Sequence, residues 1–231
     1  RFPLFSGVMN FQFLPLIEKS ATYLDHAFHT ARKKSDKALL GNWLQKIRKK
    51  ETIKIDVITA ELNTVLIKII ADFPVIEELP PFYRELAPLT MDVPAYKQSL
   101  KRVRWAAERL IVFQKTYAPN VTKAKTKEEI YRLMKEYYGR TSSVFQRLDP
   151  SLFALENARK RFKDYPDIKD LPTICIFGFP NVGKTTLLNQ LTGSKAKIAA
   201  YAFTTKGINA GYLVVDGKKI QLLDVPGTLA R

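Results

Sequence analysis

The sequence predicts an all-α helical bundle followed by an α/β domain with a mixed, mostly parallel sheet. Two observations indicate this division. Of the ten glycines, only Gly7, Gly41 and Gly139 come before residue 171, and the apolar residues of that part recur at helical spacing. Beyond residue 172 the pattern changes to short apolar runs that end at glycine, which is typical of strands. We therefore expect a helical domain over residues 1–168 and an α/β domain over residues 169–231.

The first part of the chain contains three long apolar patterns with a helical period. The third is preceded by Thr126, with Glu129 three residues later, which is the signature of a capping box. Asp149 followed by Pro150 predicts the start of a fourth helix, because aspartate accepts hydrogen bonds from first-turn amides and proline suits the first helical position. The three patterns cover residues 55–69, 100–111 and 130–145.

The charge of the chain predicts a polyanionic partner. Its 231 residues include 38 Lys and Arg against 22 Asp and Glu, a formal net charge of +16. This excess is larger than solubility requires, so nucleic acid is the first candidate and an acidic membrane surface the second. Residues 1–170 contain 31 of the cationic and 20 of the acidic side chains, so most of the excess belongs to the helical part. No apolar run approaches the roughly 18 residues of a membrane-spanning helix, and we expect RNA rather than a membrane.

Two segments of the last part have the patterns of strands. TICIFG, residues 173–178, is a nearly continuous apolar run, which predicts a buried strand of a helix-covered sheet. Cys175 lies in this run and is the single cysteine, so we expect it to be a core residue in a reducing compartment. Residues 209–225 predict a β-hairpin, because Asp216-Gly217 favours the tight turn that joins right-twisted strands.

The segment from Gly178 to Thr185 matches the phosphate-loop pattern G-x-x-x-x-G-K-[ST], between a predicted strand and a predicted helix. Glycines allow the backbone to wrap its amides around a phosphate, and the following helix adds its positive N-terminal end. The Lys184 ammonium can bridge the β- and γ-phosphates, and the Thr185 hydroxyl can bind Mg²⁺. The loop therefore predicts a site for a nucleotide with Mg²⁺.

The residues downstream of the loop predict a molecular switch. Asp224 to Gly227 has the form D-x-x-G, in which the aspartate can hold Mg²⁺ through water and the glycine amide can contact the γ-phosphate. YAFTTK, residues 201–206, lies where a switch loop offers a threonine to the metal. Phosphate loop, switch threonine and D-x-x-G in this order are typical of nucleotide-dependent switches. The predicted nucleotide-binding residues are Gly178, Phe179, Pro180, Asn181, Val182, Gly183, Lys184, Thr185, Thr186, Asp224 and Gly227.

GFPNVGKTT, YAFTTK and DVPG together resemble the translation-factor-class GTPases of the Obg and Nog group. DFPVIEELPPFYREL, YKQSL and SLFALENARKRFKDYPDI resemble the N-terminal helical domain of the Nog family of nucleolar GTP-binding proteins and their archaeal relatives. The lysine-rich, cysteine-poor composition is compatible with an archaeal member. The resemblance implies a GTPase, binding GTP and GDP, that acts in assembly of the large ribosomal subunit. It also implies a monomer whose helical domain contacts rRNA of the pre-ribosomal particle and ribosomal proteins, in the cytoplasm of an archaeon or the nucleolus of a eukaryote.

The resemblance further implies roles for single residues. In such GTPases the second threonine of F-T-T binds Mg²⁺ in the GTP state, which indicates Thr205, with Thr204 as the alternative. Thr228 stands where many signalling GTPases have the glutamine that orients water, so slow intrinsic hydrolysis, stimulated by a partner or by K⁺, is expected. Asn181 resembles the asparagine that binds K⁺ in potassium-stimulated members. The catalytic residues are then Lys184, Thr205 and Gly227.

A second interpretation remains open, in which the protein is a P-loop ATPase, a nucleotide kinase or another nucleotide-dependent switch with a helical protein-docking module. The discriminating motif is N-K-x-D, whose aspartate pairs with guanine, and it should lie some tens of residues beyond D-x-x-G. The sequence ends at Arg231, so we expect only the N-terminal part of the GTPase domain here, without this motif. Guanine specificity therefore depends on the resemblance.

Overall fold

The computed structural model describes residues 11–36, 42–165, 168–169, 171–179, 181–193, 197–199 and 208–225. The chain divides into two compact units that alternate along the sequence. The bundle unit comprises Pro15–Pro74 and Asp92–Asn157, and the mixed unit comprises Arg1–Leu14, Val75–Met91 and Ala158–Arg231. The predicted boundary after residue 168 remains a prediction.

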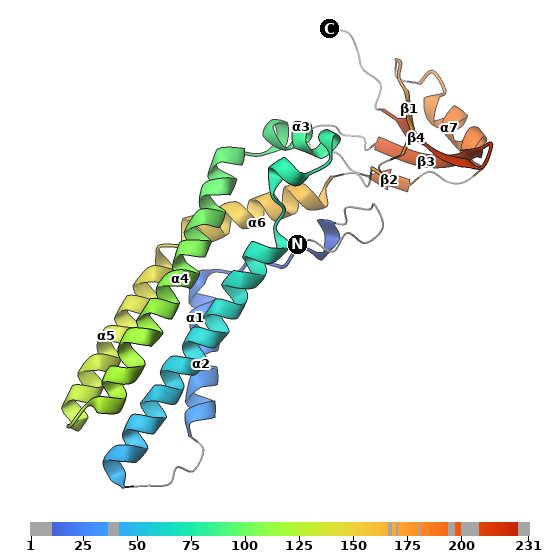
Figure 1. The fold of residues 1–231 in the computed structure, drawn as a ribbon. Coiled ribbons are helices and arrows are strands. Elements are labelled where there is room, and N and C mark those ends of the chain that lie inside the picture. Colours follow the sequence, from blue (N-terminus) through green and yellow to red (C-terminus); the bar gives the residue numbers. More distant parts are fainter. Residues whose placement is uncertain are drawn as a thin grey trace. The chain divides into compact units, whose positions relative to one another are not determined.

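The bundle unit consists of long helices that pack along their lengths (Figure 1). Helix α2 packs against α1 and α4, and α5 packs against α4. The three apolar patterns predicted from the sequence lie in α2, α4 and α5, and they bury Ile55, Leu110 and Ile130 completely. The helices are α1 Ser20–Ser35, α2 Trp43–Asp72, α4 Val93–Lys123, α5 Lys127–Gln146 and the first part of α6 Asp149–Lys163.

Tyr137 joins α5 to α2 inside this bundle. Its ring is fully buried, its hydroxyl shares a 3.0 Å hydrogen bond with the Thr59 hydroxyl, and it lies 3.2 Å from the Ile55 carbonyl oxygen, to which it donates. Burial raises the pKa of Tyr137 to about 12. The phenol therefore stays a hydrogen-bond donor throughout the physiological pH range.

Two predicted helix starts are present, and each differs from the prediction in one side-chain hydrogen bond. The Thr126 hydroxyl accepts from the Glu129 amide at 3.2 Å, while the Glu129 carboxylate accepts from the Lys125 amide rather than closing the capping box on Thr126. Helix α6 begins at Asp149 as predicted, yet this carboxylate accepts from the Ser20 amide and hydroxyl, both at 2.9 Å. The residue before α1 is Lys19, which has no acceptor for those groups. Asp149 therefore caps α1 from another helix.

The mixed unit has an aromatic cluster around Phe11. The Phe11 ring stacks on Phe162 with centroids 5.2 Å apart and meets Tyr83 edge-on at the same distance. The Tyr83 hydroxyl donates to the Ile168 carbonyl and accepts from the Ile168 amide, which fixes the segment that precedes the sheet. Short helices complete this part: η1 Phe11–Phe13, η2 Ile76–Glu78, α3 Pro81–Thr90 and the last turns of α6.

The sheet of the mixed unit has the strand order β1-β4-β3-β2, with α7 Lys184–Thr192 packed against β3 and β4. The predicted hairpin is confirmed, and its turn residues Asp216 and Gly217 have φ values of 51° and 74°. Such left-handed values are those of the tight hairpin turn. The strands are β1 Thr173–Ile176, β2 Lys197–Ala199, β3 Ile208–Val215 and β4 Lys218–Asp224.

The sheet is mixed, as predicted, but among the described strands it is not mostly parallel. Strands β1 and β4 are parallel, whereas β4–β3 and β3–β2 are antiparallel. A parallel pair needs a long crossover, while a two-residue turn produces an antiparallel pair. The Asp216-Gly217 turn therefore accounts for the antiparallel pair of β3 and β4. The parallel partners β1 and β4 are separated in the sequence by α7, β2 and β3, which provides the long connection that a parallel pair needs.

The prediction of a buried strand with Cys175 in a core is wrong. Cys175 is exposed, and Ile174 and Phe177 are 51% and 71% exposed. A continuous apolar run is buried only where both faces of its strand are covered. Strand β1 lies at one edge of the described sheet, and the described helix α7 packs on β3 and β4.

Among the described helices, none combines the length and apolar content needed to cross a bilayer.

We predict that Asp149→Ala lowers the stability of the bundle unit by about 1 kcal/mol, because the first turn of α1 then loses its acceptor. Urea titration followed by circular dichroism measures this loss. Asp25→Ala is the control, since Asp25 is an exposed acid on α1 itself. The Asp149→Ala and Ser20→Ala effects should be strongly non-additive, and additive effects would contradict the capping role.

Candidate nucleotide-binding site

The phosphate loop connects the end of β1 to the start of α7. Gly183 immediately precedes the helix with φ of 88°, and Asn181 has φ of 61°. Both values lie in the left-handed region, which glycine adopts without cost and asparagine adopts more readily than most residues. The G-x-x-x-x-G spacing thus places a permissive residue where the loop turns into the helix.

Helix α7 lies very close to β3. Leu188 is fully buried, and a Cβ atom added at Gly211 would lie 2.5 Å from Cγ2 of Thr192. A contact below 3 Å requires the Thr192 side chain or the helix that carries it to move. Gly211 therefore sets how closely α7 approaches β3, and thereby the position of the phosphate loop relative to the edge of the sheet.

The start of α7 presents donors for an anion. Gly183 has no side chain that could accept from the first-turn amides, so these amides keep their hydrogen-bonding capacity. The Lys184 ammonium donates to the Phe179 carbonyl oxygen at 2.7 Å, across the mouth of the loop. A phosphate oxygen is a stronger acceptor than this carbonyl. The loop can thus exchange an internal hydrogen bond of Lys184 for one to a phosphate.

Thr185 and Asp224 meet although they are 39 positions apart in the sequence. The Thr185 hydroxyl donates to a carboxylate oxygen of Asp224, whose side chain is buried with 4% of the residue exposed. Asp224 is the last residue of β4 and pairs in register with Ile176, the last residue of β1. Because carboxyl ends of parallel strands share one sheet edge, the loop after β1 and this carboxylate come together there.

The donor set at this edge fits Mg²⁺. A hydroxyl and a carboxylate are hard oxygen ligands, and protein Mg²⁺ sites use one or two carboxylates with phosphate and water as the other ligands. Within the described part of the chain, no cluster of three or more His, Cys, Asp and Glu could hold a metal by itself. The arrangement is therefore one in which the nucleotide would complete the coordination.

The structure brings part of the predicted site together. Lys184, Thr185 and Thr186 form the first turn of α7, with Asp224 beside Thr185. Phe179 and Val182 are both 62% exposed on the loop. The side chain of Asn181 is also exposed. Pro180, Thr204, Thr205, Gly227 and Thr228 lie outside the described residues.

Gln221 is a residue that the sequence reasoning missed. It is completely buried in β4. Its side-chain oxygen Oε1 accepts from the Lys169 backbone amide at 2.9 Å, and its side-chain nitrogen Nε2 donates to the Thr173 hydroxyl at 3.3 Å. These bonds hold the start of β1 against β4. A glutamine in a hairpin strand predicts a solvent-facing side chain, so no signal in the sequence identifies this role.

A strand, a phosphate loop, a helix and an acidic residue at the end of the adjacent parallel strand define a P-loop nucleotide-binding domain. Residues 173–231 match the family model described as 50S ribosome-binding GTPase. Residues 11–169 match the family model described as NOG1 N-terminal helical domain. The chain therefore belongs to the NOG1 family of GTP-binding proteins, as the resemblance predicted.

Curated relatives agree with this assignment. An uncharacterized protein of Methanocaldococcus jannaschii is 39% identical over 189 residues, which cover 82% of this chain and 53% of the relative. Nucleolar GTP-binding protein 1 of Drosophila melanogaster is 29% identical over 228 residues, covering 96% of this chain and 34% of the relative. The Arabidopsis thaliana protein of the same name is 28% identical over 227 residues, with 96% and 33% covered. The chain thus spans about half the length of the archaeal relative and about a third of the nucleolar proteins.

We predict that Gly211→Ala destabilises the mixed unit by about 1–3 kcal/mol, because the new methyl group overlaps Thr192. Thermal melting measures the loss of stability, and hydrogen exchange of the α7 amides shows whether this helix is affected. Gly139→Ala is the matched control, since a Cβ there would meet nothing within 4 Å and alanine favours a helix. A Gly211→Ala protein as stable as the Gly139→Ala protein would show that α7 is not held by this contact.

Proposed function

We propose that this protein hydrolyses GTP to GDP and phosphate and acts as an assembly factor for the large ribosomal subunit, with its helical part contacting rRNA. The observation that supports hydrolysis most directly is the meeting of Thr185, at the start of α7, with buried Asp224 at the end of β4. The assembly role is supported by the family descriptions, in which a 50S ribosome-binding GTPase follows a NOG1 helical domain.

In the proposed reaction, water attacks the γ-phosphate in line with the leaving diphosphate. Lys184 leaves the Phe179 carbonyl and binds the β- and γ-phosphates, while the first-turn amides of α7 hold the β-phosphate. Thr185 and Asp224, with Thr205 as a further ligand, would hold Mg²⁺. Bound Mg²⁺ supplies neutralisation of the charge that develops on the phosphate oxygens. The proposed role of Gly227 is to contact the γ-phosphate through its amide.

We further propose that the site is slow by itself and is completed by a partner or by K⁺. Thr228 occupies the position of the water-orienting glutamine, so this chain lacks that means of catalysis. Asn181 is exposed on the loop in a left-handed conformation, which leaves its side-chain oxygen accessible to a monovalent cation. Equal hydrolysis rates in K⁺ and Na⁺ would contradict the K⁺ role of Asn181.

The proposed division of labour assigns RNA contact to residues 1–168 and nucleotide binding to residues 169–231. The protein would work as a monomer on the pre-ribosomal particle, beside ribosomal proteins, in the cytoplasm of an archaeon or the nucleolus of a eukaryote. The alternative is a P-loop ATPase or other nucleotide-dependent switch whose helical part docks a protein.

Lys184→Ala should weaken binding of fluorescent GDP by at least about tenfold, because a charge-assisted hydrogen bond to phosphate is lost. Equilibrium titration of the full-length protein measures it. Lys218→Ala, at the exposed hairpin, removes the same charge from the mixed unit and should leave the affinity unchanged. Unlabelled GDP should displace the probe and ADP should not, and preferential displacement by ADP would favour the ATPase interpretation.

The RNA contact is supported by a surface at one end of the bundle unit, formed by Trp43, Lys127 and Tyr131. Trp43 and Tyr131 are 60% and 50% exposed. The Lys127 ammonium lies 5.6 Å from the Trp43 ring centroid and 5.3 Å from the Tyr131 ring centroid. Exposed rings beside cations are the combination on which unpaired bases stack and phosphates bind.

Trp43→Ala should weaken binding of a large-subunit rRNA fragment by about tenfold, because one base loses its stacking surface. Fluorescence anisotropy measures the affinity, and wild-type binding should fall steeply as salt increases. Trp105→Ala is the matched control, since Trp105 is 48% exposed on α4. Equal losses in the two variants would remove Trp43 from the interface, and salt-insensitive binding would contradict an RNA contact through phosphates.

A further inference from the structure

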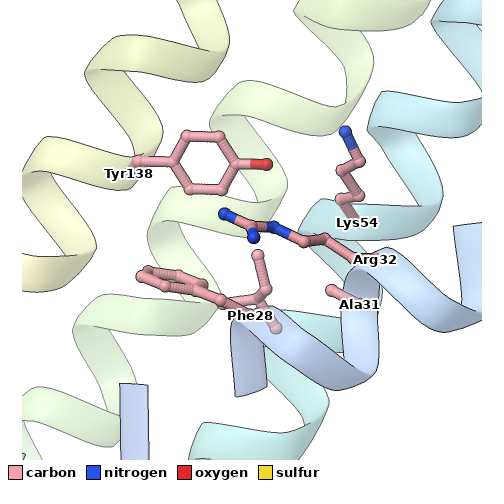
Figure 2. A pocket seen from close by; sticks show the side chains of 6 residues that line it. Phe28, Ala31, Arg32, Lys54 and Tyr138 are labelled. Atoms are coloured by element: carbon pink, nitrogen blue, oxygen red, sulfur yellow. The ribbon is translucent and has the colours of Figure 1, made fainter. Parts of the chain in front are cut away.

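The bundle unit contains a pocket of about 330 Å³ between α1, α2 and α5. Figure 2 shows its lining, in which the Arg32 side chain reaches from α1 toward Tyr138, and Lys54 projects from α2. This volume is at the lower end of the range for small-molecule sites. The lining residues are Phe28, Ala31, Arg32, Lys54, Ile58 and Tyr138.

Of the two cations that line the pocket, Lys54 is already paired, whereas Arg32 has no ion pair among the described residues. The Lys54 ammonium donates to the Glu51 carboxylate at 2.6 Å, and both side chains are largely buried, with 16% and 10% exposed. No described carboxylate forms an ion pair with Arg32. The charge left over at the pocket is therefore positive and belongs mainly to the Arg32 guanidinium, which can bind a phosphate through two parallel hydrogen bonds.

Tyr138 adds a neutral donor to these cations. Burial raises the pKa of Tyr138 above its ordinary value, and the nearby Glu51 carboxylate raises it further. The phenol is therefore protonated at physiological pH and can donate a hydrogen bond to an anionic oxygen.

The rest of the lining is apolar. Ile58 and Ala31 are each 1% exposed, and the Phe28 ring meets the Tyr138 ring edge-on with centroids 5.5 Å apart. Because Ile58 and Ala31 are already covered, the half-buried Phe28 ring is the apolar surface that a ligand can reach, and a free inorganic anion would not use it. A ligand with a flat ring and a phosphate uses both parts, and RNA offers it wherever a base is unstacked.

We propose that the pocket between α1, α2 and α5 binds one unstacked nucleotide of an RNA strand, with Arg32 toward its phosphate and Phe28 against its base. This inference rests on the proposed RNA contact of the helical part. It adds a second site, a partly open pocket, to the surface formed by Trp43, Lys127 and Tyr131. It also gives a role to Arg32, which forms no ion pair with the carboxylates that the structure describes.

The test compares Arg32→Gln with Lys33→Gln, using a fluorescein-labelled RNA hairpin with a single-nucleotide bulge and the whole 231-residue chain. Both variants remove one positive charge from the last turn of α1, so they change the total charge and the helix-end electrostatics equally. Lys33 is exposed and does not line the pocket. Arg32→Gln should weaken binding about tenfold and reduce the salt slope by about one, while Lys33→Gln should have less than about a twofold effect.

Two further measurements separate the pocket from general RNA binding. Tyr138→Phe, which removes only the hydroxyl, should weaken binding of the bulged hairpin but not of a fully paired hairpin. Equal losses for Arg32→Gln and Lys33→Gln, or equal wild-type affinities for the two hairpins, would overturn the pocket and leave the RNA contact standing. Wild-type protein that binds neither hairpin would overturn both. AMP that binds wild type but not Arg32→Gln, without discrimination between the hairpins, would assign the pocket to a free nucleotide and overturn the RNA proposal.

Discussion

The parallel pairing of β1 with β4 is the contact on which the candidate site depends. It places Asp224 opposite Ile176, so the carboxylate and the phosphate loop leave the sheet at the same edge. Burial of Asp224 and its bond to Thr185 then follow from that register. A shift of one residue would turn the carboxylate to the other face of the sheet and separate it from the helix start.

Two polar or small residues hold this arrangement in place, and neither contacts the phosphate loop. Gln221 ties the beginning of β1 and the preceding segment to β4, so the parallel register is fixed at the end opposite the site. Gly211 lets α7 approach β3 closely enough for Leu188 to be buried. The geometry of the site therefore depends on the register of β1 with β4 and on the distance between α7 and β3. The phosphate-loop motif encodes neither of them.

The sequence predicted what depends on local chemistry. Backbone preferences and periodicity act within a few residues. They predicted the glycine turn of the phosphate loop, the Asp216-Gly217 turn and the long helices, and all three are present in the structure. The wrong or missing predictions concern contacts between residues that are far apart in the sequence. Cys175 was predicted to be buried because its run is apolar, but burial depends on what covers β1. Asp149 caps α1 over 129 positions of sequence, and the pocket beside Arg32 needs three helices to exist.

The net charge alone does not locate an RNA interface, because several cations of the bundle already have structural partners. Lys34 pairs with Glu61, Lys50 pairs with Asp36, and Arg48 donates to the Ala124 carbonyl at the end of α4. These groups would have to give up their partners before binding a phosphate. Lys127 and Arg32 differ, because neither is held by a described carboxylate. Lys127 lies over the Trp43 and Tyr131 rings, and Arg32 lines a pocket together with Phe28 and Tyr138. A cation beside a ring offers both phosphate binding and base stacking, and this combination, more than the count of +16, is what distinguishes a nucleic-acid site from a solvated helix face.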